Sequence, residues 1–201
     1  MPDVHVPHFE GRSKSLLKIG LEVLLISAGV FLGLLGEQWR EHAHQRELAE
    51  LSLRRFRTEI VANRKAVAGV KDYHVTLKKS VDTFLKADAK ARRDLDVDMR
   101  GLQPANFEHT AWDLALVTQS LAYIDPQLAF ALSRIYTGQQ TYVDLSRGMM
   151  QRMYLRTPAE DTPGFLSAVS IYYGDLVILE PGLLSQYDDV LPQIDRALGV
   201  R

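Results

Sequence analysis

An uninterrupted apolar run near the N-terminus is the feature that most constrains what this chain can fold into. From Leu16 to Gly36 the sequence reads LLKIGLEVLLISAGVFLGLLG, and Lys18 and Glu22 are its only charged residues. A helix rises about 1.5 Å per residue, so a run of this length reaches roughly 30 Å, the thickness of a bilayer's hydrocarbon core. A buried helix of a soluble protein would normally show a polar face, and this run shows very little of one. We therefore expect residues 16–36 to form a transmembrane helix.

The flanking residues distinguish a retained anchor from a cleaved signal peptide. Residues 1–15 form a short tail that carries basic residues, as a signal peptide would. However, no small-x-small cleavage pattern follows the apolar run, and the residues from Glu37 onward are typical of a helix that leaves the membrane. Trp39 lies where an interfacial aromatic residue belongs, with Arg40 just beyond it. We expect an uncleaved anchor in which Trp39 and Arg40 mark the membrane interface.

The polar residues and the glycines of the span share one helical face. Gly29 and Gly33 have the small-x-x-x-small spacing that lets two membrane helices approach closely. A carboxyl within hydrocarbon is costly unless it is paired, neutralised or near the headgroups, so Glu22 on this face suggests a contact with protein. The alternative is that Glu22 pairs with Lys18 one turn away and extends outward. The hypothesis is a helix–helix interface, in a homo-oligomer or with a larger membrane partner, formed by Lys18, Glu22, Gly29, Gly33 and Gly36.

A long helix is expected to follow the membrane, over residues 37–93. No proline occurs between Gly36 and Pro104, and Gly69 is the only glycine between Gly36 and Gly101. Within this range a heptad seam is sustained over more than four repeats, and we expect it to pack on the chain's own later helices rather than on a second copy. Polar residues interrupt it at two positions, which commonly sets register, and we assign His74 no further function. The seam consists of Leu53, Phe56, Ile60, Asn63, Val67, Val70, His74, Leu77, Val81 and Phe84.

Residues 94–201 are expected to form a helical bundle domain that packs on the long helix. Asp94 to Gln103 is interpreted as a loop, and Thr110 followed by Asp113 is a capping signal for the next helix. Asp125 before Pro126 predicts a second, cleaner helix start. An apolar seam beginning at Phe165 is expected to stop at Pro181 and Gly182, before a last amphipathic piece that contains Pro192.

No segment alternates with a period of two for long, so the expected fold class is all-α. It consists of one N-terminal transmembrane helix that continues into a long helix, with four or five helices in a bundle-like soluble domain.

Parts of the sequence resemble an uncharacterised bacterial family of short single-pass membrane proteins of unknown function. The signature of that family is a glycine and a glutamate, an apolar run, and then a tryptophan followed by an acid, which Gly20, Glu22, Gly29, Trp39 and Glu41 resemble. The stretch SLAYIDPQLAFALSRIY is similar to the family's central region of a small helix, a short loop and a leucine-rich helix ending in tyrosine.

Two departures from this pattern occur in the anchor. Gly20 stands two residues before Glu22, where the family usually has them adjacent, and Arg40 replaces a more typical asparagine. The C-terminal third adds nothing specific to the resemblance. What the resemblance implies is a one-pass bacterial membrane protein that is helical beyond the membrane and has no established activity.

The composition excludes several kinds of chemistry. Without any cysteine the chain forms no disulfide, thiol nucleophile or Cys-ligated metal centre. A formal net charge of -1 gives no global attraction to nucleic acid, and the basic clusters are interspersed with acids. The six histidines offer no ligand pair on one helical face, and no phosphate-binding loop or nucleophile with an evident base is present. We therefore expect a non-enzyme with no cofactor, no metal, no catalytic residue, no nucleic-acid partner and no identified small-molecule substrate.

These observations favour an interaction or scaffold role in a membrane. The expected partners are the lipid bilayer and, through the span, either a second copy or other membrane subunits. The alternative is an extracytoplasmic sensory or ligand-binding module, by analogy with other helical domains on single anchors. Long domains translocate largely regardless of charge, so the short basic tail places the soluble domain in the periplasm and the span in the bacterial inner membrane.

Overall fold

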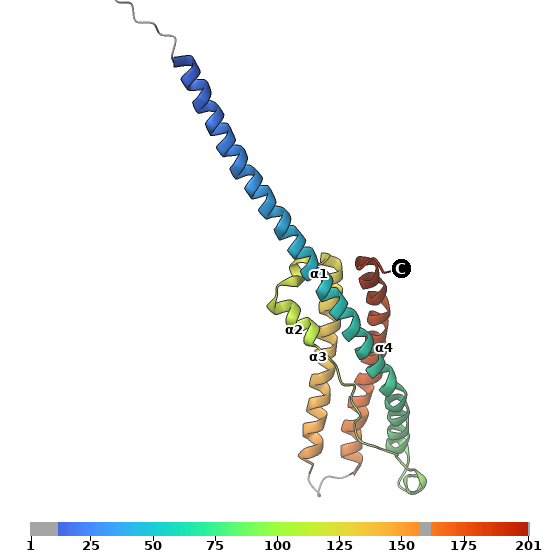
Figure 1. The fold of residues 1–201 in the computed structure, drawn as a ribbon. Coiled ribbons are helices and arrows are strands. Elements are labelled where there is room, and N and C mark those ends of the chain that lie inside the picture. The colour runs from blue at the N-terminus through green and yellow to red at the C-terminus, as the bar shows by residue number, and fades with distance from the viewer. Residues whose placement is uncertain (1–11, 157–161, 201) are drawn as a thin grey trace, which may run out of the picture. The chain divides into compact units, whose positions relative to one another are not determined.

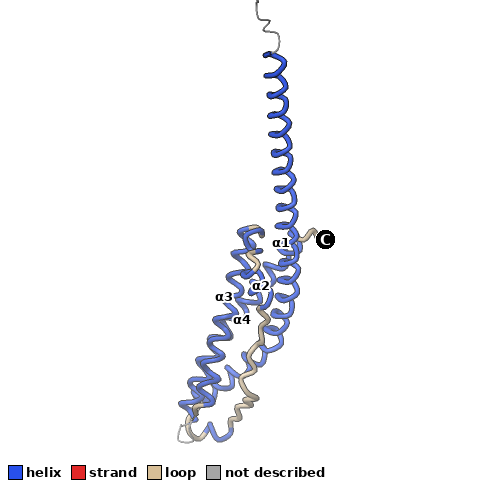
Figure 2. The backbone as a smooth tube through the Cα atoms, turned by 60° about the vertical axis from the view of Figure 1, so that its left-hand side comes forward, coloured by secondary structure: helices blue, strands red, loops and turns tan. Residues whose placement is uncertain are grey.

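The computed structural model describes residues 12–156 and 162–200, and the regular structure of these residues is entirely helical (Figures 1 and 2). The helices α1 (Arg12–Lys86), α2 (Thr110–Val117), α3 (Pro126–Tyr154) and α4 (Thr162–Ala197) are joined by two short 3₁₀ turns, η1 (Ala91–Asp94) and η2 (Ser120–Tyr123). The all-α prediction is confirmed for this part of the chain. The chain divides into two compact units, Met1–Glu47 and Leu48–Arg201, which are described separately below.

The first unit is a single helical stretch whose side chains are exposed on every side. α1 begins at Arg12, before the apolar run and within the range expected to be a tail; the rest of that tail lies outside the described residues. Every residue from Gly20 to His44 is exposed, including the large apolar ones. By length and composition, α1 and α4 are the helices of the described residues that could span a membrane, and the apolar window of α1 is 0% buried.

The second unit is built around the heptad seam of α1. Eight of the ten seam residues are buried, and Val70 and Phe84 are half-buried against the same core. Their neighbours in that core come from α2, α3, α4 and the segment between α1 and α2. The seam residues of α1 thus share one core with residues of the later helices.

The end of α1 is set by local polar contacts rather than by a helix breaker. The Asp88 carboxylate accepts hydrogen bonds from the backbone N–H groups of Lys90 and Ala91, which turns the chain. Arg92 donates to the Phe84 and Leu85 carbonyls in the last turn of the helix, and the Phe84 carbonyl also accepts from Ala87 N at 3.3 Å. The helix thus ends at Lys86, short of residue 93 where the sequence pattern placed its end.

The starts of α2 and α3 differ in how they are capped. The Asp125 side chain accepts from Gln127 N at 2.9 Å and from Leu128 N at 3.1 Å, so the predicted N-cap is confirmed. The capping prediction at Thr110 was wrong: His109 holds the N-cap position and makes no side-chain cap. Instead, the Glu59 carboxylate on α1 accepts from Ala111 N at 2.8 Å, so a residue 52 positions away satisfies the first turn.

α4 runs from Thr162 to Ala197 as one helix, with Pro181 and Pro192 inside it. The prediction that the helix stops at Pro181 and Gly182 was therefore wrong. A proline inside a helix costs about 3 kcal/mol because it removes one backbone hydrogen bond and crowds the preceding turn. Beyond Pro181, α4 still buries a full apolar face against the core, which offsets this cost: Leu183, Tyr187, Val190 and Ile194.

α4 lies antiparallel to both α1 and α3 within this unit (Figures 1 and 2). Its first half meets the end of α1, where Ser170 donates to Asp82, and its last turns meet an earlier part of α1, where Arg57 binds Asp195. Contacts with α3 follow the same order, from Ser146 with Tyr172 to Gln139 with Tyr187.

Candidate functional site

The residues predicted to form a helix–helix interface lie along one side of α1, and their side chains are exposed. At about 100° per residue, Lys18, Glu22, Gly29, Gly33 and Gly36 fall within a stripe about 60° wide. A Cβ added at any of the three glycines would meet no heavy atom within 4 Å. The stripe therefore offers room for a second helix to approach the backbone closely.

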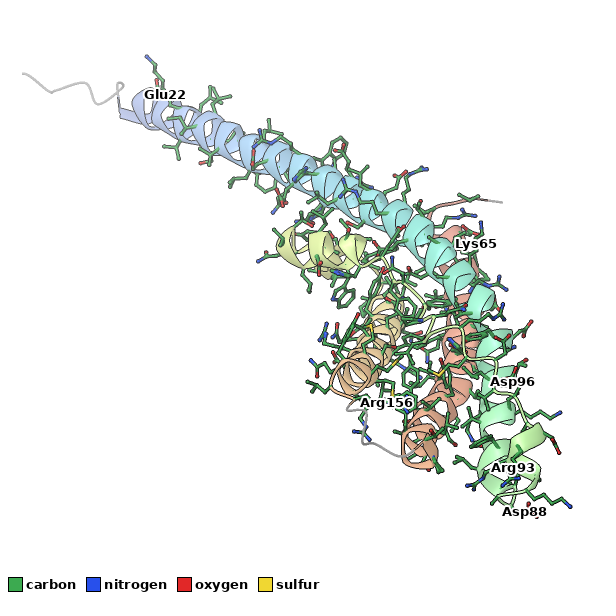
Figure 3. The ribbon with its side chains drawn as sticks, turned by 90° about the horizontal axis from the view of Figure 1, so that it is seen from below. Glu22, Lys65, Asp88, Arg93, Asp96 and Arg156 are labelled. Carbon is green, nitrogen blue, oxygen red and sulfur yellow. The ribbon has the colours of Figure 1, made fainter. Side chains whose placement is uncertain are left out.

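Glu22 lies near the N-terminal end of α1 (Figure 3). Among the described residues no ion pair joins it to Lys18, although the two stand one turn apart on the same stripe. Its carboxyl group therefore lacks the local partner that would lower its cost in hydrocarbon.

The residues predicted at the membrane interface are also exposed. Trp39 is 84% exposed, and Arg40 donates to the Glu37 carboxylate at 2.7 Å on the helix surface. A large exposed aromatic ring one turn beyond an apolar helix is the arrangement found at membrane–water boundaries.

The polar residues of the second unit gather inside it, around an extended segment that we call the strap, residues 95–109. Figure 2 shows the strap as a loop running back along the helices. Tyr73 of α1 donates to the Gly101 carbonyl at 2.7 Å, and Asn63 exchanges two hydrogen bonds with the backbone of Glu108, at 2.7 and 2.8 Å. Tyr142 of α3 accepts from Ala105 N. Side chains of α1 and α3 thus satisfy backbone groups of the strap that, in a β-sheet, would pair with a neighbouring strand.

At the centre of this arrangement His74 of α1 meets Glu180 of α4. His74 Nδ1 and Glu180 Oε1 are 2.6 Å apart, and both side chains are fully buried. The other ring nitrogen, Nε2, faces two carbonyl oxygens, those of Leu102 and Gln103, at 3.2 and 3.0 Å. Because carbonyls only accept, Nε2 carries hydrogen and donates to them.

The pair shares one further proton between Nδ1 and Oε1. Whether this proton belongs to the ring or to the carboxyl, His74 and Glu180 together carry no net charge. A neutral, hydrogen-bonded pair avoids the large cost of an isolated buried charge. Tyr142 adds a third hydrogen bond by donating to Glu180 Oε1 at 3.1 Å.

Tyrosines surround the pair and exclude water from it. Burial raises the pKa of Tyr142, Tyr172 and Tyr173 above the ordinary value. Tyr173 donates to the Leu102 carbonyl at 3.1 Å and its ring lies 5.2 Å from the His74 ring. No solvent-exposed substrate can reach groups packed in this way, so the geometry describes a structural joint between α1, α4 and the strap.

The sequence indicated part of this joint. The sequence places His74 in the seam and assigns it no further function, and the structure shows a buried histidine with both ring nitrogens hydrogen-bonded. Glu59 and Glu180 were missed. The available signal for Glu180 was its spacing, because it lies four residues after Leu176 in the apolar series of α4 and is fully buried there.

Grooves open to solvent lie between the helices. One of about 530 Å³ lies between α2 and α3, with Phe107, Trp112 and Tyr136 in its wall and His109 at its rim. Two more lie between α3 and α4, of about 630 Å³ and 200 Å³. In the described ranges, no group of three or more histidine, aspartate or glutamate side chains is arranged to hold a metal ion.

Comparisons of the chain with protein-family models, with curated proteins and with solved structures find no match.

Proposed function

We propose that this protein is a single-pass, membrane-anchored helical interaction protein that associates through the glycine-lined face of its span, with itself or as an accessory subunit of a larger membrane assembly. The observation that carries the proposal is the exposed apolar first part of α1 with Glu22 on the same stripe as Gly29 and Gly33. The role is one of binding and not of catalysis.

The single-pass topology is supported by the chemistry of α4, the other helix long enough to cross a bilayer. A third of its apolar window is buried inside the protein, and it holds the buried Glu180. Two of its carboxylates, Asp188 and Asp195, form ion pairs with arginines of α1 at 2.7 and 2.6 Å. A helix with these partners serves as the core of a bundle-like soluble domain. If α4 crossed a bilayer instead, it would leave α1, and lipid would not replace the arginine partners of its carboxylates.

The proposed location is the bacterial inner membrane with the second unit in the periplasm. A reporter enzyme that is active only after export, fused to the C-terminus, is expected to be active. Activity of a cytoplasm-only reporter at the same position would reverse the topology and leave the interaction role untouched.

The association is tested with the full chain in mild detergent at native expression level. Gly33→Leu and Glu22→Leu are expected to weaken association at least tenfold, because a large side chain keeps the helices apart and leucine removes the hydrogen-bonding group. Gly20→Leu is the matched control, since Gly20 lies on the opposite side of α1, about 140° from Gly33 and about 170° from the middle of the stripe. Equal association of all three variants and of the natural chain would contradict the proposal.

A ligand-binding role is the second candidate, and the groove between α2 and α3 favours it. Its aromatic wall includes Trp112 stacked on Tyr136 at 5.0 Å, and the buried Gln139 lines it. An aromatic wall with a few polar groups, such as the Gln139 amide, is typical of small-molecule sites. Replacement of Trp39 by phenylalanine leaves Trp112 as the only tryptophan. Its fluorescence in that variant then reports whether a metabolite extract contains a ligand.

A further inference from the structure

α3 and α4 carry a second heptad seam on the surface, separate from the seams that fill the core. On α4 it runs through Ala168, Ile171, Asp175, Ile178 and Gly182 in steps of three and four. Ile171 is 68% exposed and Ile178 is 75% exposed. Large aliphatic side chains at seam spacing on a solvent-facing helix indicate an unpartnered packing surface.

The matching seam on α3 lies beside it. The groove of about 630 Å³ is lined by Leu145 and Gly148 of α3 together with Ile171 of α4. Further along, the groove of about 200 Å³ is lined by Arg134 of α3 and by Asp189 of α4. Arg134, Leu145 and Gly148 are separated by successive steps of three and four residues, so they lie on the same side of α3. We call this surface the α3–α4 face: Arg134, Leu145, Gly148, Ile171, Ile178 and Asp189.

Arg134 of α3 and Asp175 and Asp189 of α4 are exposed charged residues on this face. Within the described ranges none of these three has an ion-pair partner. Asp144, which pairs with Arg147, and Arg152 also line the larger groove from α3. Arg134 and Asp189 lie at the same level, because both line one groove. A twofold axis along the helices would place α3 of one copy against α4 of the other and bring each Arg134 to the other copy's Asp189.

The size of the face suits a dimer. Between Ile171 and Asp189 α4 rises about 27 Å, and a face about 18 Å wide, two helices side by side, covers roughly 500 Å². Two such faces together bury about 1,000 Å², the area that a specific interface has to reach. Small residues allow close approach: a Cβ on Gly148 or Gly182 would meet no atom within 4 Å. Anchoring in one bilayer raises the effective concentration of the two copies.

We propose that the α3–α4 face binds the same face of a second copy of this chain, with α3 of each copy antiparallel to α4 of the other. The inference rests on the self-association form of the proposed function and names the surface through which the soluble domain takes part in it. Ile171 and Ile178 supply the apolar contact, and Arg134 with Asp189 sets the pairing.

The decisive experiment reverses the two charges in separate chains. Arg134→Asp and Asp189→Arg each place like charges together in a homodimer, so each variant alone is expected to lose dimer at least tenfold. Co-expressed with different tags, the two variants form a mixed dimer in which both contacts join opposite charges. Copurification of the two tags at the level of the natural chain is expected. A mixed dimer no more abundant than either homodimer overturns the proposal.

The apolar contact is tested in the same full-length chain in mild detergent. Ile171→Asp with Ile178→Asp is expected to abolish the dimer, whereas Val117→Asp is the control, because Val117 is 82% exposed on α2, outside the face. Circular dichroism with thermal unfolding shows whether each variant folds, and these exposed positions leave the core intact. An unchanged dimer in the double variant overturns the proposal.

Failure of this proposal is distinguishable from failure of the proposed function. If Gly33→Leu weakens association while the charge reversals do not, the interface lies in the span alone: the α3–α4 inference fails and the proposed function stands. If neither set of variants changes association, both fail.

Discussion

His74 Nδ1 and Glu180 Oε1 lie 2.6 Å apart in the core, although the two residues are 106 positions apart in the chain. The contact joins α1 to α4, and the other ring nitrogen of His74 holds the strap through two backbone carbonyls. Three segments that are far apart in sequence are therefore held together by the hydrogen bonds of one imidazole ring.

Removal of either partner is expected to destabilise the second unit strongly. His74→Leu or Glu180→Leu leaves the other group buried without its partner, at a cost of about 3–5 kcal/mol. The double substitution is expected to cost less than the sum of the two, because it leaves neither group unpaired. Chemical denaturation followed by circular dichroism measures these costs. Asp175→Asn, at an exposed position on the same helix, is the control and should change stability by no more than about 0.5 kcal/mol. Additive costs of the two single substitutions would contradict the coupling.

The strap is expected to loosen when Asn63 is changed. Its amide both donates to the Glu108 carbonyl and accepts from the Glu108 N–H, which no apolar side chain can do. Asn63→Leu should cost about 1 kcal/mol, since it leaves the part-buried backbone N–H and carbonyl of Glu108 without their side-chain partner. Hydrogen exchange is the measurement: the Glu108 amide should lose protection while the Leu128 amide, capped by Asp125, keeps it. Equal protection of Glu108 in both proteins would contradict this role.

Acid is expected to weaken the contact between α1 and α4 at Asp82. Hydrogen bonds from Lys78 and Ser170 hold the pKa of this carboxyl below its usual range. A depressed folded-state pKa contributes stability above the unfolded pKa of about 3.9, and that stability is lost as the pH falls through the folded value. The stability difference between the natural chain and Asp82→Asn should thus be present at neutral pH and vanish in acid. Because the pair is partly exposed, about 1 kcal/mol or less is expected.

Alkali is expected to act through the buried tyrosines, with Tyr187 as the clearest case. Burial raises the pKa of Tyr187 to about 12, although the hydrogen bond that Gln139 donates to its hydroxyl lowers this pKa in part. A raised folded-state pKa gives stability that is complete below the unfolded value of about 10 and is lost as the pH rises towards the folded one. In a titration with alkali, the tyrosinate absorbance of Tyr187 should therefore appear at a higher pH than that of an exposed tyrosine. In Tyr187→Phe the component of absorbance that titrates near pH 12 should be lost, whereas Tyr136, Tyr142 and Tyr173, whose pKa values are raised further, titrate later still. An unchanged component near pH 12 would assign it to another tyrosine.

Local patterns determined the parts of the fold that depend on residues a few positions apart. The apolar run produced a helix exposed on every side, the seam of α1 became the core, and Asp125 caps α3. The stripe of α1 that carries Glu22, Gly29 and Gly33 was also readable, because three- and four-residue spacing fixes which side chains share a helical face.

Distant contacts decided the rest. Pro181 predicts a helix end by its local chemistry, yet α4 continues because its later residues are buried against the core. The first turn of α2 has no side-chain cap of its own and depends on Glu59 of α1, and a carboxylate such as Glu180 finds its histidine only after α1 and α4 have packed. The sequence by itself determined helix type, the apolar faces and the stripe of α1, since these follow from backbone periodicity. Only the tertiary structure decided where helices end and which buried polar groups pair, because those outcomes depend on the free energy of packing between distant segments.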